Sequence, residues 1–308
     1  MGGMSVANLQ VTVAGVQFEN PLIAASGTFG FGREFAELYP LRTLGGISCK
    51  GITLRERAGN PPPRIAETPA GMLNAVGLQN PGVDHFIAND LPWLKEQGTA
   101  VIANIAGNTP EEYCEMAEKL SDTAVDMIEM NISCPNVKQG GVQFGTSCSG
   151  VESITAAVRD HCKKPLMVKL SPNVTDISEI AAAAESAGAD AVSMINTLTG
   201  MRIDINTRRP IIRNNTGGLS GPALLPVAIR MVSQVHRRVN IPIVGMGGIS
   251  KWQDAVEMLL AGAAALQIGT VLFSDPYAPV KIAQGLEQYL DGHGIAGVVD
   301  LTGKAELW

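Results

Sequence analysis

The chain has 308 residues, 45% of them hydrophobic, with a formal net charge of −6 and a pI of about 5.3. This length and apolar content can form a sizeable core, and the acidic balance excludes the basic surface that nucleic acids select. No apolar run reaches the ~18 residues needed to cross a membrane, and no signal-peptide pattern is visible. We therefore expect one domain over residues 1–308, with no nucleic-acid or membrane partner.

The cysteines are odd in number and widely spaced. They are Cys49, Cys114, Cys134, Cys148 and Cys162. This usage is typical of a reducing cytoplasm and argues against a disulfide framework. None lies in a CxxC pair, so we expect no metal and no iron–sulfur cluster in this chain.

The chain begins with a predicted hairpin and continues as short apolar runs that alternate with helix-like segments. Residues 9–18 alternate around Ala14-Gly15, which predicts the hairpin. The predicted strands are 21–25, 46–50, 101–105, 127–132, 166–170, 191–195, 241–245 and 265–268. The predicted helices include 110–120, 151–161, 176–187, 222–237, 252–261 and 276–290, with Thr109 and Thr175 as candidate N-caps.

Eight apolar runs alternating with helices favour an α/β fold of the (β/α)8 TIM-barrel type, with its active site at the carboxyl ends of the strands. Polar and small residues do lie at or just past the end of each run: Ser26, Lys50, Asn104, Asn131, Lys169, Asn196, Gly247 and Gly269. A doubly wound open sheet is the alternative, but no GxGxxG opens a helix after the first strand.

Glycine-rich loops follow the last two predicted strands. They are Gly245-Met-Gly-Gly-Ile-Ser250 and Gly269-Thr270. In many barrels the loops at these two places hold a phosphate with backbone N–H groups, whose close approach glycine permits. Residues 217–222 could add a third edge to such a cradle. The alternative is that these glycines form tight turns only.

Lysines and asparagines at the strand ends predict a polar ligand. An unpaired lysine is costly to bury, so Lys50 and Lys169 suit an anion or an electron-rich ring. The amides of Asn104, Asn131 and Asn196 offer both donors and acceptors, which suits a heterocycle with C=O and N–H groups. The alternative is that the lysines merely end strands. In the loop 74–82, Asn74 and the backbone of Gly77 and Leu78 could bind a substrate, and the alternative is an ordinary irregular loop. The stretch 197–221 could be a surface excursion, a partner-binding face or part of a lid, and we expect its arginines to be solvated.

The segment 126–136 ends a buried strand in a cluster of polar groups around a thiol. Cys134 is followed by Pro135, which cannot continue a strand, and then by a loop that spans residues 137–149. A thiol in this position could act on a small substrate. The alternative is a buried small hydrophobe, as many free cysteines are.

Taken in order, these motifs resemble dihydroorotate dehydrogenase of class 1 over nearly the whole chain. The matching segments are Lys50-Gly51, Asn74-Ala-Val-Gly-Leu78, Asn131-Ile-Ser-Cys-Pro-Asn136, Val168-Lys-Leu-Ser-Pro172, Ile195-Asn-Thr197, Gly247-Gly248 and Gly269-Thr270. The cysteine at position 134 makes the chain resemble class 1 rather than class 2, whose members have serine at the matching position. Residues 55–64 and 74–81 resemble the NAD-linked class 1B catalytic subunit more than the fumarate-linked class 1A enzyme.

This resemblance implies oxidation of dihydroorotate to orotate in de novo pyrimidine biosynthesis, on one FMN per chain. Cys134 would be the general base, with hydride transfer to FMN, and Ser133 would orient its thiol. Substrate binding is implied for Lys50, Asn74, Ala75, Val76, Gly77, Leu78, Asn131, Asn196 and Thr197. FMN binding is implied for Ser26, Lys50, Gly51, Asn104, Asn131, Lys169, Ile195, Gly221, Gly247, Gly248, Gly269 and Thr270.

The resemblance also implies a partner subunit that carries FAD and a [2Fe–2S] cluster and passes electrons to NAD. The expected assembly is a homodimer core within a heterotetramer. Alternatives are the fumarate-linked class 1A enzyme and an FMN barrel like dihydropyrimidine dehydrogenase. A non-catalytic barrel that senses a phosphorylated metabolite and an aldolase with Lys169 as Schiff-base nucleophile leave the segment around Cys134 without a role.

Overall fold

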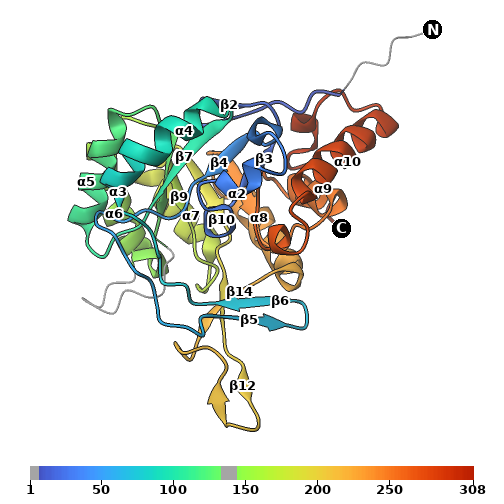
Figure 1. The fold of residues 1–308 in the computed structure, drawn as a ribbon. Helices are drawn as coiled ribbons and strands as arrows, with labels where there is room; N and C mark the ends of the chain where they lie inside the picture. The colour runs from blue at the N-terminus through green and yellow to red at the C-terminus, as the bar shows by residue number, and fades with distance from the viewer. Residues whose placement is uncertain (1–6, 133–143) are drawn as a thin grey trace.

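The computed structural model describes residues 7–132 and 144–308 and has a closed barrel of eight parallel strands at its centre (Figure 1). Around the barrel the strands follow the order β10-β15-β16-β3-β4-β7-β8-β9. Their bounds are β3 (Leu22–Ala24), β4 (Gly46–Ser48), β7 (Ala100–Ile105), β8 (Met127–Asn131), β9 (Leu166–Lys169), β10 (Ala191–Met194), β15 (Ile243–Met246) and β16 (Ala265–Ile268). The predicted (β/α)8 barrel is therefore confirmed, and the open-sheet alternative was wrong.

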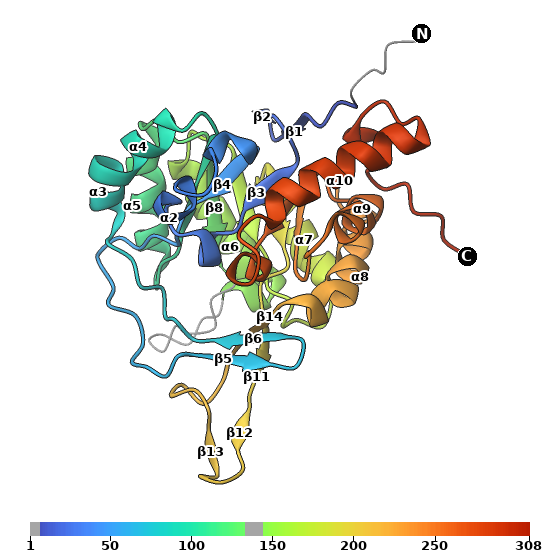
Figure 2. The same cartoon turned by 45° about the vertical axis from the view of Figure 1, so that its right-hand side comes forward.

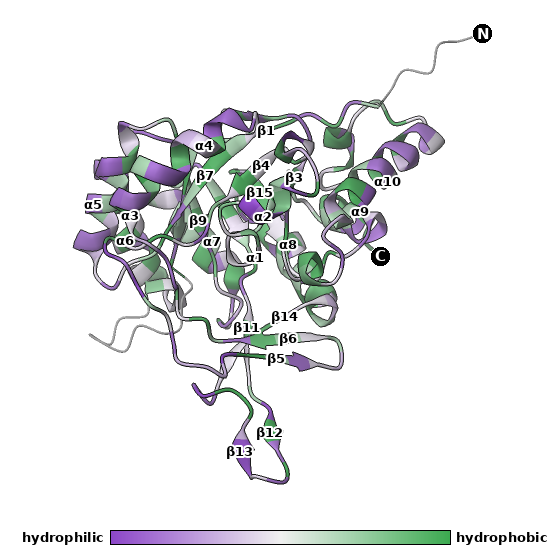
Figure 3. Ribbon diagram, viewed as in Figure 1, coloured by the Kyte–Doolittle hydropathy of each residue, from purple (hydrophilic) through white to green (hydrophobic). Residues whose placement is uncertain are grey.

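Helices surround the barrel and cover the outer face of its strands. The longer ones are α4 (Leu91–Glu96), α5 (Pro110–Ser121), α6 (Cys148–His161), α7 (Ile177–Ser186), α8 (Leu225–His236), α9 (Trp252–Leu260) and α10 (Ala278–His293). The shorter ones are α1 (Ser26–Phe29), α2 (Arg33–Ala36), α3 (Val83–His85), η1 (Leu41–Thr43), η2 (Phe86–Asp90), η3 (Phe144–Thr146), η4 (Pro222–Leu224), η5 (Thr270–Phe273) and η6 (Val298–Leu301). Figure 3 shows apolar strands inside and polar helix faces outside. Burial on both faces explains why the strands read as continuous apolar runs.

The predicted helix starts were partly right. Thr109 caps α5, since its hydroxyl accepts a hydrogen bond from the Glu112 N–H at 3.4 Å. Thr175 was the wrong residue for α7: Asp176 is the cap and accepts from Ser178 N–H at 2.8 Å. A carboxylate forms the stronger, charge-assisted bond and also suits the positive end of the helix dipole.

The predicted N-terminal hairpin is present, as β1 (Val11–Val13) paired with β2 (Val16–Phe18). Ala14 and Gly15 form its turn with φ values of 48° and 81°, the left-handed pair that a two-residue hairpin loop requires. Phe18 is fully buried against Gly46, the first residue of β4. The hairpin therefore lies at the amino ends of the barrel strands, away from the end expected to hold the site.

A second, antiparallel sheet lies below the barrel in Figure 1, and we call it the lid sheet. Its order is β11 (Leu198–Gly200), β14 (Gly217–Ser220), β6 (Gly71–Asn74) and β5 (Ile65–Thr68). The two ends of the stretch 197–221 thus belong to this sheet: β11 pairs with β14, and β14 pairs with residues 72–74 of β6. Short, glycine-rich strands give a weak local signal, and their pairing is set by contacts distant in sequence.

Between β11 and β14 a narrow arm projects from the molecule, built on β12 (Ile203–Asp204) and β13 (Arg209–Pro210) (Figure 2). The predicted surface position of the arginines in this region is confirmed. The exposed set is Arg202, Arg208, Arg209 and Arg213. Across residues 7–132 and 144–308, no helix has the length and apolar character required to cross a membrane.

Candidate active site

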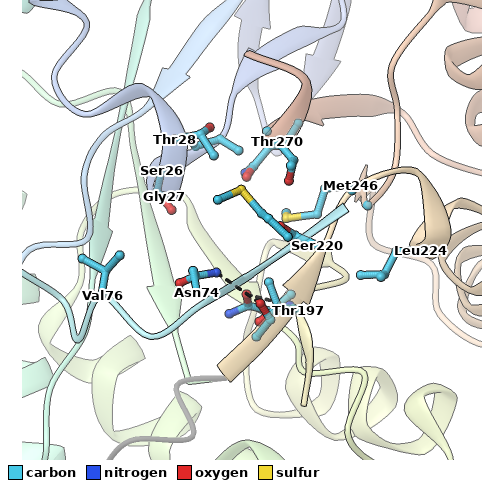
Figure 4. A pocket seen from close by; sticks show the side chains of 18 of the residues that line it. Ser26, Gly27, Thr28, Asn74, Val76, Thr197, Ser220, Leu224, Met246 and Thr270 are labelled. Carbon is cyan, nitrogen blue, oxygen red and sulfur yellow. Dashed lines mark hydrogen bonds between the residues drawn. The ribbon is translucent and has the colours of Figure 1, made fainter. Parts of the chain in front are cut away.

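A pocket opens at the carboxyl ends of the barrel strands, and the lid sheet forms one of its walls (Figure 4). The structure brings together every predicted substrate and cofactor residue that it describes. These pocket-lining residues are Ser26, Lys50, Gly51, Asn74, Ala75, Val76, Gly77, Leu78, Asn104, Asn131, Lys169, Ile195, Asn196, Thr197, Gly221, Gly247, Gly248, Gly269 and Thr270. Cys134 and Ser133 lie outside the described residues.

Two lysines supply positive charge to the pocket. Lys169 ends β9 and is only 5% exposed, and Lys50 follows β4 and is partly buried. Burial, and secondly the nearby Arg64, lowers the pKa of Lys50. Neither lysine forms a direct ion pair with a residue that the structure describes. The charge of Lys169 interacts with the buried carboxylate of Glu129, whereas an anionic ligand would offset the cost of burying the charge of Lys50.

The amide side chains are held by the surrounding backbone. Asn74 donates from Nδ2 to the Gly218 carbonyl at 3.4 Å, across the pairing of β6 with β14. Asn196 accepts from the Thr197 N–H at 2.8 Å, and both residues lie just beyond β10. The backbone carbonyl of Asn131, at the end of β8, accepts from the Tyr113 hydroxyl at 2.8 Å. Barrel strands and lid sheet together therefore fix the amides of Asn74 and Asn196 and the backbone that carries Asn131.

Two of the glycine loops meet at the start of α8, and the third lines the same pocket. Gly248 follows β15 with φ +84°, and a Cβ there would lie 2.5 Å from the Leu225 nitrogen, the first residue of the helix. Gly221, with φ +109°, precedes η4, which leads directly into α8. Gly269 precedes η5 and lines the same pocket. Only glycine permits this close packing, and helix starts have N–H groups available for an anion.

Below the pocket, the barrel interior contains a buried carboxylate that the sequence interpretation missed. Glu129 of β8 is fully buried and accepts four side-chain hydrogen bonds. The donors are Ser48 Oγ at 2.5 Å, Asn104 Nδ2 at 2.5 Å, Ser193 Oγ at 2.6 Å and Gln267 Nε2 at 2.7 Å. Since β16 and β8 are not neighbours in the barrel, the bond from Gln267 crosses its interior.

The charge of Glu129 is stabilised by its surroundings. Burial alone would raise the pKa of this carboxyl, but Lys169 and the hydrogen bonds from Ser193, Ser48 and Asn104 outweigh that effect and lower it. A signal for this group was present in the sequence. An ionisable residue within an apolar strand run must find buried partners, and Gln267 within another run was one candidate.

A closed (β/α)8 barrel with a lysine- and amide-lined pocket at the carboxyl ends of its strands defines a barrel enzyme, because barrel active sites lie at that end. The sequence profile of the family described as dihydroorotate dehydrogenase matches residues 8–290. The chain belongs to this family and is therefore an oxidoreductase, which confirms the resemblance drawn from its motifs.

Full-length relatives share more than half of their residues with this chain. One from Geotalea uraniireducens (strain Rf4) is 55% identical over 301 residues, covering 97% of this chain and 99% of that protein. One from Geobacter sp. (strain M21) is 53% identical over 305 residues, covering 99% and 100%. One from Alkaliphilus oremlandii (strain OhILAs) is 52% identical over 301 residues, covering 98% and 100%. All three are named dihydroorotate dehydrogenase B (NAD(+)), catalytic subunit.

Proposed function

We propose that this chain is the catalytic subunit of an NAD-linked dihydroorotate dehydrogenase, which oxidises dihydroorotate to orotate in de novo pyrimidine biosynthesis. One observation supports this most directly: all predicted substrate and cofactor residues within the described ranges line one pocket. Relatives that carry this name match the chain from end to end. We further propose that residues 1–308 form one domain in the cytoplasm.

The pocket residues fit FMN. Two buried acceptors, Asn104 Oδ1 and Gln267 Oε1, have no hydrogen-bond partner within the described chain and could receive a ring N–H group. Gly221, Gly248 and Gly269 provide the cradle for a phosphate at the start of α8. When bound, FMN supplies the hydride acceptor that no amino-acid side chain provides.

Lys169 has the position to stabilise negative charge on the flavin ring. Its ammonium is nearly fully buried at the pocket floor, where an electrostatic interaction is stronger than in water. The remaining proposed flavin contacts are Ser26, Lys50, Gly51, Asn131, Ile195, Gly247 and Thr270.

Substrate binding is proposed for the lysine and amides at the lid-sheet side of the pocket. The Lys50 ammonium would pair with the carboxylate of dihydroorotate, helped by the backbone N–H groups of Gly77 and Leu78. The amides of Asn74, Asn131 and Asn196 and the hydroxyl of Thr197 would bind the ring carbonyl and N–H groups. Ala75 and Val76 line the same wall.

Cys134 is the proposed general base, on the sequence motif alone, since it lies outside the described residues. Its thiolate would take the proton from substrate C5 while the hydride leaves C6. A free thiol has a pKa near ~8.5, so the base form is a minority at neutral pH. Ser133 would orient the thiol.

The electrons would leave through a partner subunit that carries FAD and a [2Fe–2S] cluster and reduces NAD. The words "catalytic subunit" in the relatives' names support a second subunit. We propose a homodimer of this chain with one partner on each protomer, a heterotetramer.

The test is a visible spectrum of the purified chain with FMN, before and after anaerobic addition of dihydroorotate. We expect a flavin band that bleaches with dihydroorotate but not with dihydrouracil. Bleaching by dihydrouracil instead would assign the barrel to the other pyrimidine. A chain that binds no FMN would contradict the proposed function. Rapid reoxidation by fumarate without a partner would favour the class 1A type.

A further inference from the structure

The buried network around Glu129 decides which end of two amides faces the pocket. An ionised carboxylate is only a hydrogen-bond acceptor. Asn104 and Gln267 must therefore present their NH2 groups to Glu129, which they do at 2.5 and 2.7 Å. Their carbonyl oxygens are then directed away from Glu129, and both residues line the pocket.

These two oxygens are buried and have no partner in the part of the chain that the structure describes. Asn104 Oδ1 faces Gly51, since a Cβ at Gly51 would lie 3.1 Å from it. Leaving a buried acceptor unpaired costs about 1–3 kcal/mol. Two such acceptors at one pocket floor therefore indicate a ligand that carries a donor, such as the N–H of a planar ring.

We propose that Glu129 is a positioning residue, which holds the amide nitrogens of Asn104 and Gln267 so that their oxygens accept a hydrogen bond from the pyrimidine-ring N–H of the bound flavin. The same carboxylate balances the charge of Lys169 at the pocket floor. This inference rests on the proposed function, because it takes FMN as the ligand.

The first experiment measures FMN affinity of the apo-protein by quenching of flavin fluorescence. In Glu129→Gln the new amide can donate as well as accept, so the side-chain amides of Asn104 and Gln267 are free to flip and present their NH2 groups to the pocket. We expect FMN to bind about 5-fold more weakly or worse, since the hydrogen bond from the single ring N–H, shared by the two oxygens, contributes about 1 kcal/mol. Thr155→Val, which alters a buried hydroxyl away from the pocket, is the control and should bind like wild type.

A double-mutant cycle separates positioning from general support of the fold. Gln267→Leu removes one acceptor but keeps the carboxylate. If Glu129 acts through Gln267, the loss of FMN affinity caused by Glu129→Gln should be smaller in the Gln267→Leu background than in wild type. Additive costs would show that Glu129 supports only the fold and would overturn the proposal.

The midpoint potential of bound FMN gives a second readout that a purely structural role would not move. Without the carboxylate, Lys169 is uncompensated and should favour the reduced ring. A tenfold gain in the ratio of reduced to oxidised affinity corresponds to about +30 mV for a two-electron couple. Wild-type affinity together with wild-type potential in Glu129→Gln would overturn the proposal.

Two further outcomes are also decisive. If Glu129→Gln fails to fold, Gln267→Leu carries the test: weaker FMN binding supports the acceptor assignment, and unchanged binding overturns it. A wild-type chain without FMN affinity would overturn both this inference and the proposed function. Dihydroorotate enters none of these measurements, so a wrong substrate would be seen only in the bleaching experiment.

Discussion

Lys50 lies in the pocket with no carboxylate paired to it among the described residues. Its buried charge therefore lowers the stability of the ligand-free chain. Burial first, and Arg64 second, lower its pKa. The protonated side chain is therefore disfavoured in the fold and is expected to be neutralised by the substrate carboxylate. A residue placed for binding in this way reduces stability until its ligand arrives.

Replacing Lys50 by Met should weaken dihydroorotate binding about 100-fold, the usual effect of losing a hydrogen bond between charged groups. The same variant should unfold at a higher temperature than wild type without ligand. Between the lowered pKa and the ordinary value of 10.5, the unfolded wild-type chain binds more protons than the folded one. Wild-type stability therefore rises with pH in this window, and the advantage of the variant should shrink there. Substrate titration and thermal unfolding at several pH values check both parts.

Cys134→Ser should slow flavin reduction by dihydroorotate by about 10²–10⁴-fold near neutral pH, because an alcohol is a far weaker base than a thiol. FMN content should be unchanged. Anaerobic stopped-flow measurements of the flavin band test this, with the exposed Cys148→Ser as the matched control. Wild-type rates should also rise with pH as the thiolate forms. Equal rates in the two variants would remove Cys134 from the role of base.

At the level of residues, the sequence located most of the pocket and missed what lies beneath it. Lys50, Asn104 and Lys169 were predictable because each lies at or near the end of an apolar run, and barrel strands present their carboxyl ends to one site. The partners of Glu129 were not predictable in this way. They come from four other strands, up to 138 positions away in sequence, and only the closed barrel brings them together.

The elements differ in how strongly the local sequence specifies them. Barrel strands such as β8 are covered on both faces and read as apolar runs, and helices such as α5 have capping residues. The lid sheet has neither signal, because its strands are half-buried and contain Gly71, Gly217 and Gly218. Its shape depends on close contacts between distant backbones, which composition does not reveal.

Gly218→Ala tests the lid sheet as an element. A Cβ at this position would lie 2.6 Å from the Thr197 Cβ, so β14 or the Thr197 segment must shift. We expect the KM for dihydroorotate to rise about 10-fold or more, with FMN retention and the main unfolding transition little changed, since the barrel is untouched. Gly292→Ala on α10, where a Cβ meets no atom within 4 Å, is the control. A lower unfolding temperature with unchanged KM would assign Gly218 to stability instead.

For the whole molecule, we expect the isolated chain to perform only half of the proposed reaction. Dihydroorotate should reduce its flavin, but NAD should not reoxidise it at a useful rate until the electron-transfer subunit is added. Absorbance of NADH at 340 nm, read with and without that subunit, tests this. Rapid NADH formation by the chain alone would contradict the proposed division between the subunits.

The lid sheet joins two segments that the chain order keeps far apart. Strands β5 and β6 come from the first half of the barrel, and β11 and β14 come from the second half, with Leu73 opposite Leu219 in the pairing. A barrel cut after α6 would divide this sheet between two fragments, neither of which has a complete pocket wall. The proposed substrate site thus requires the two half-barrels in contact, so during synthesis it can form only after the second half has left the ribosome.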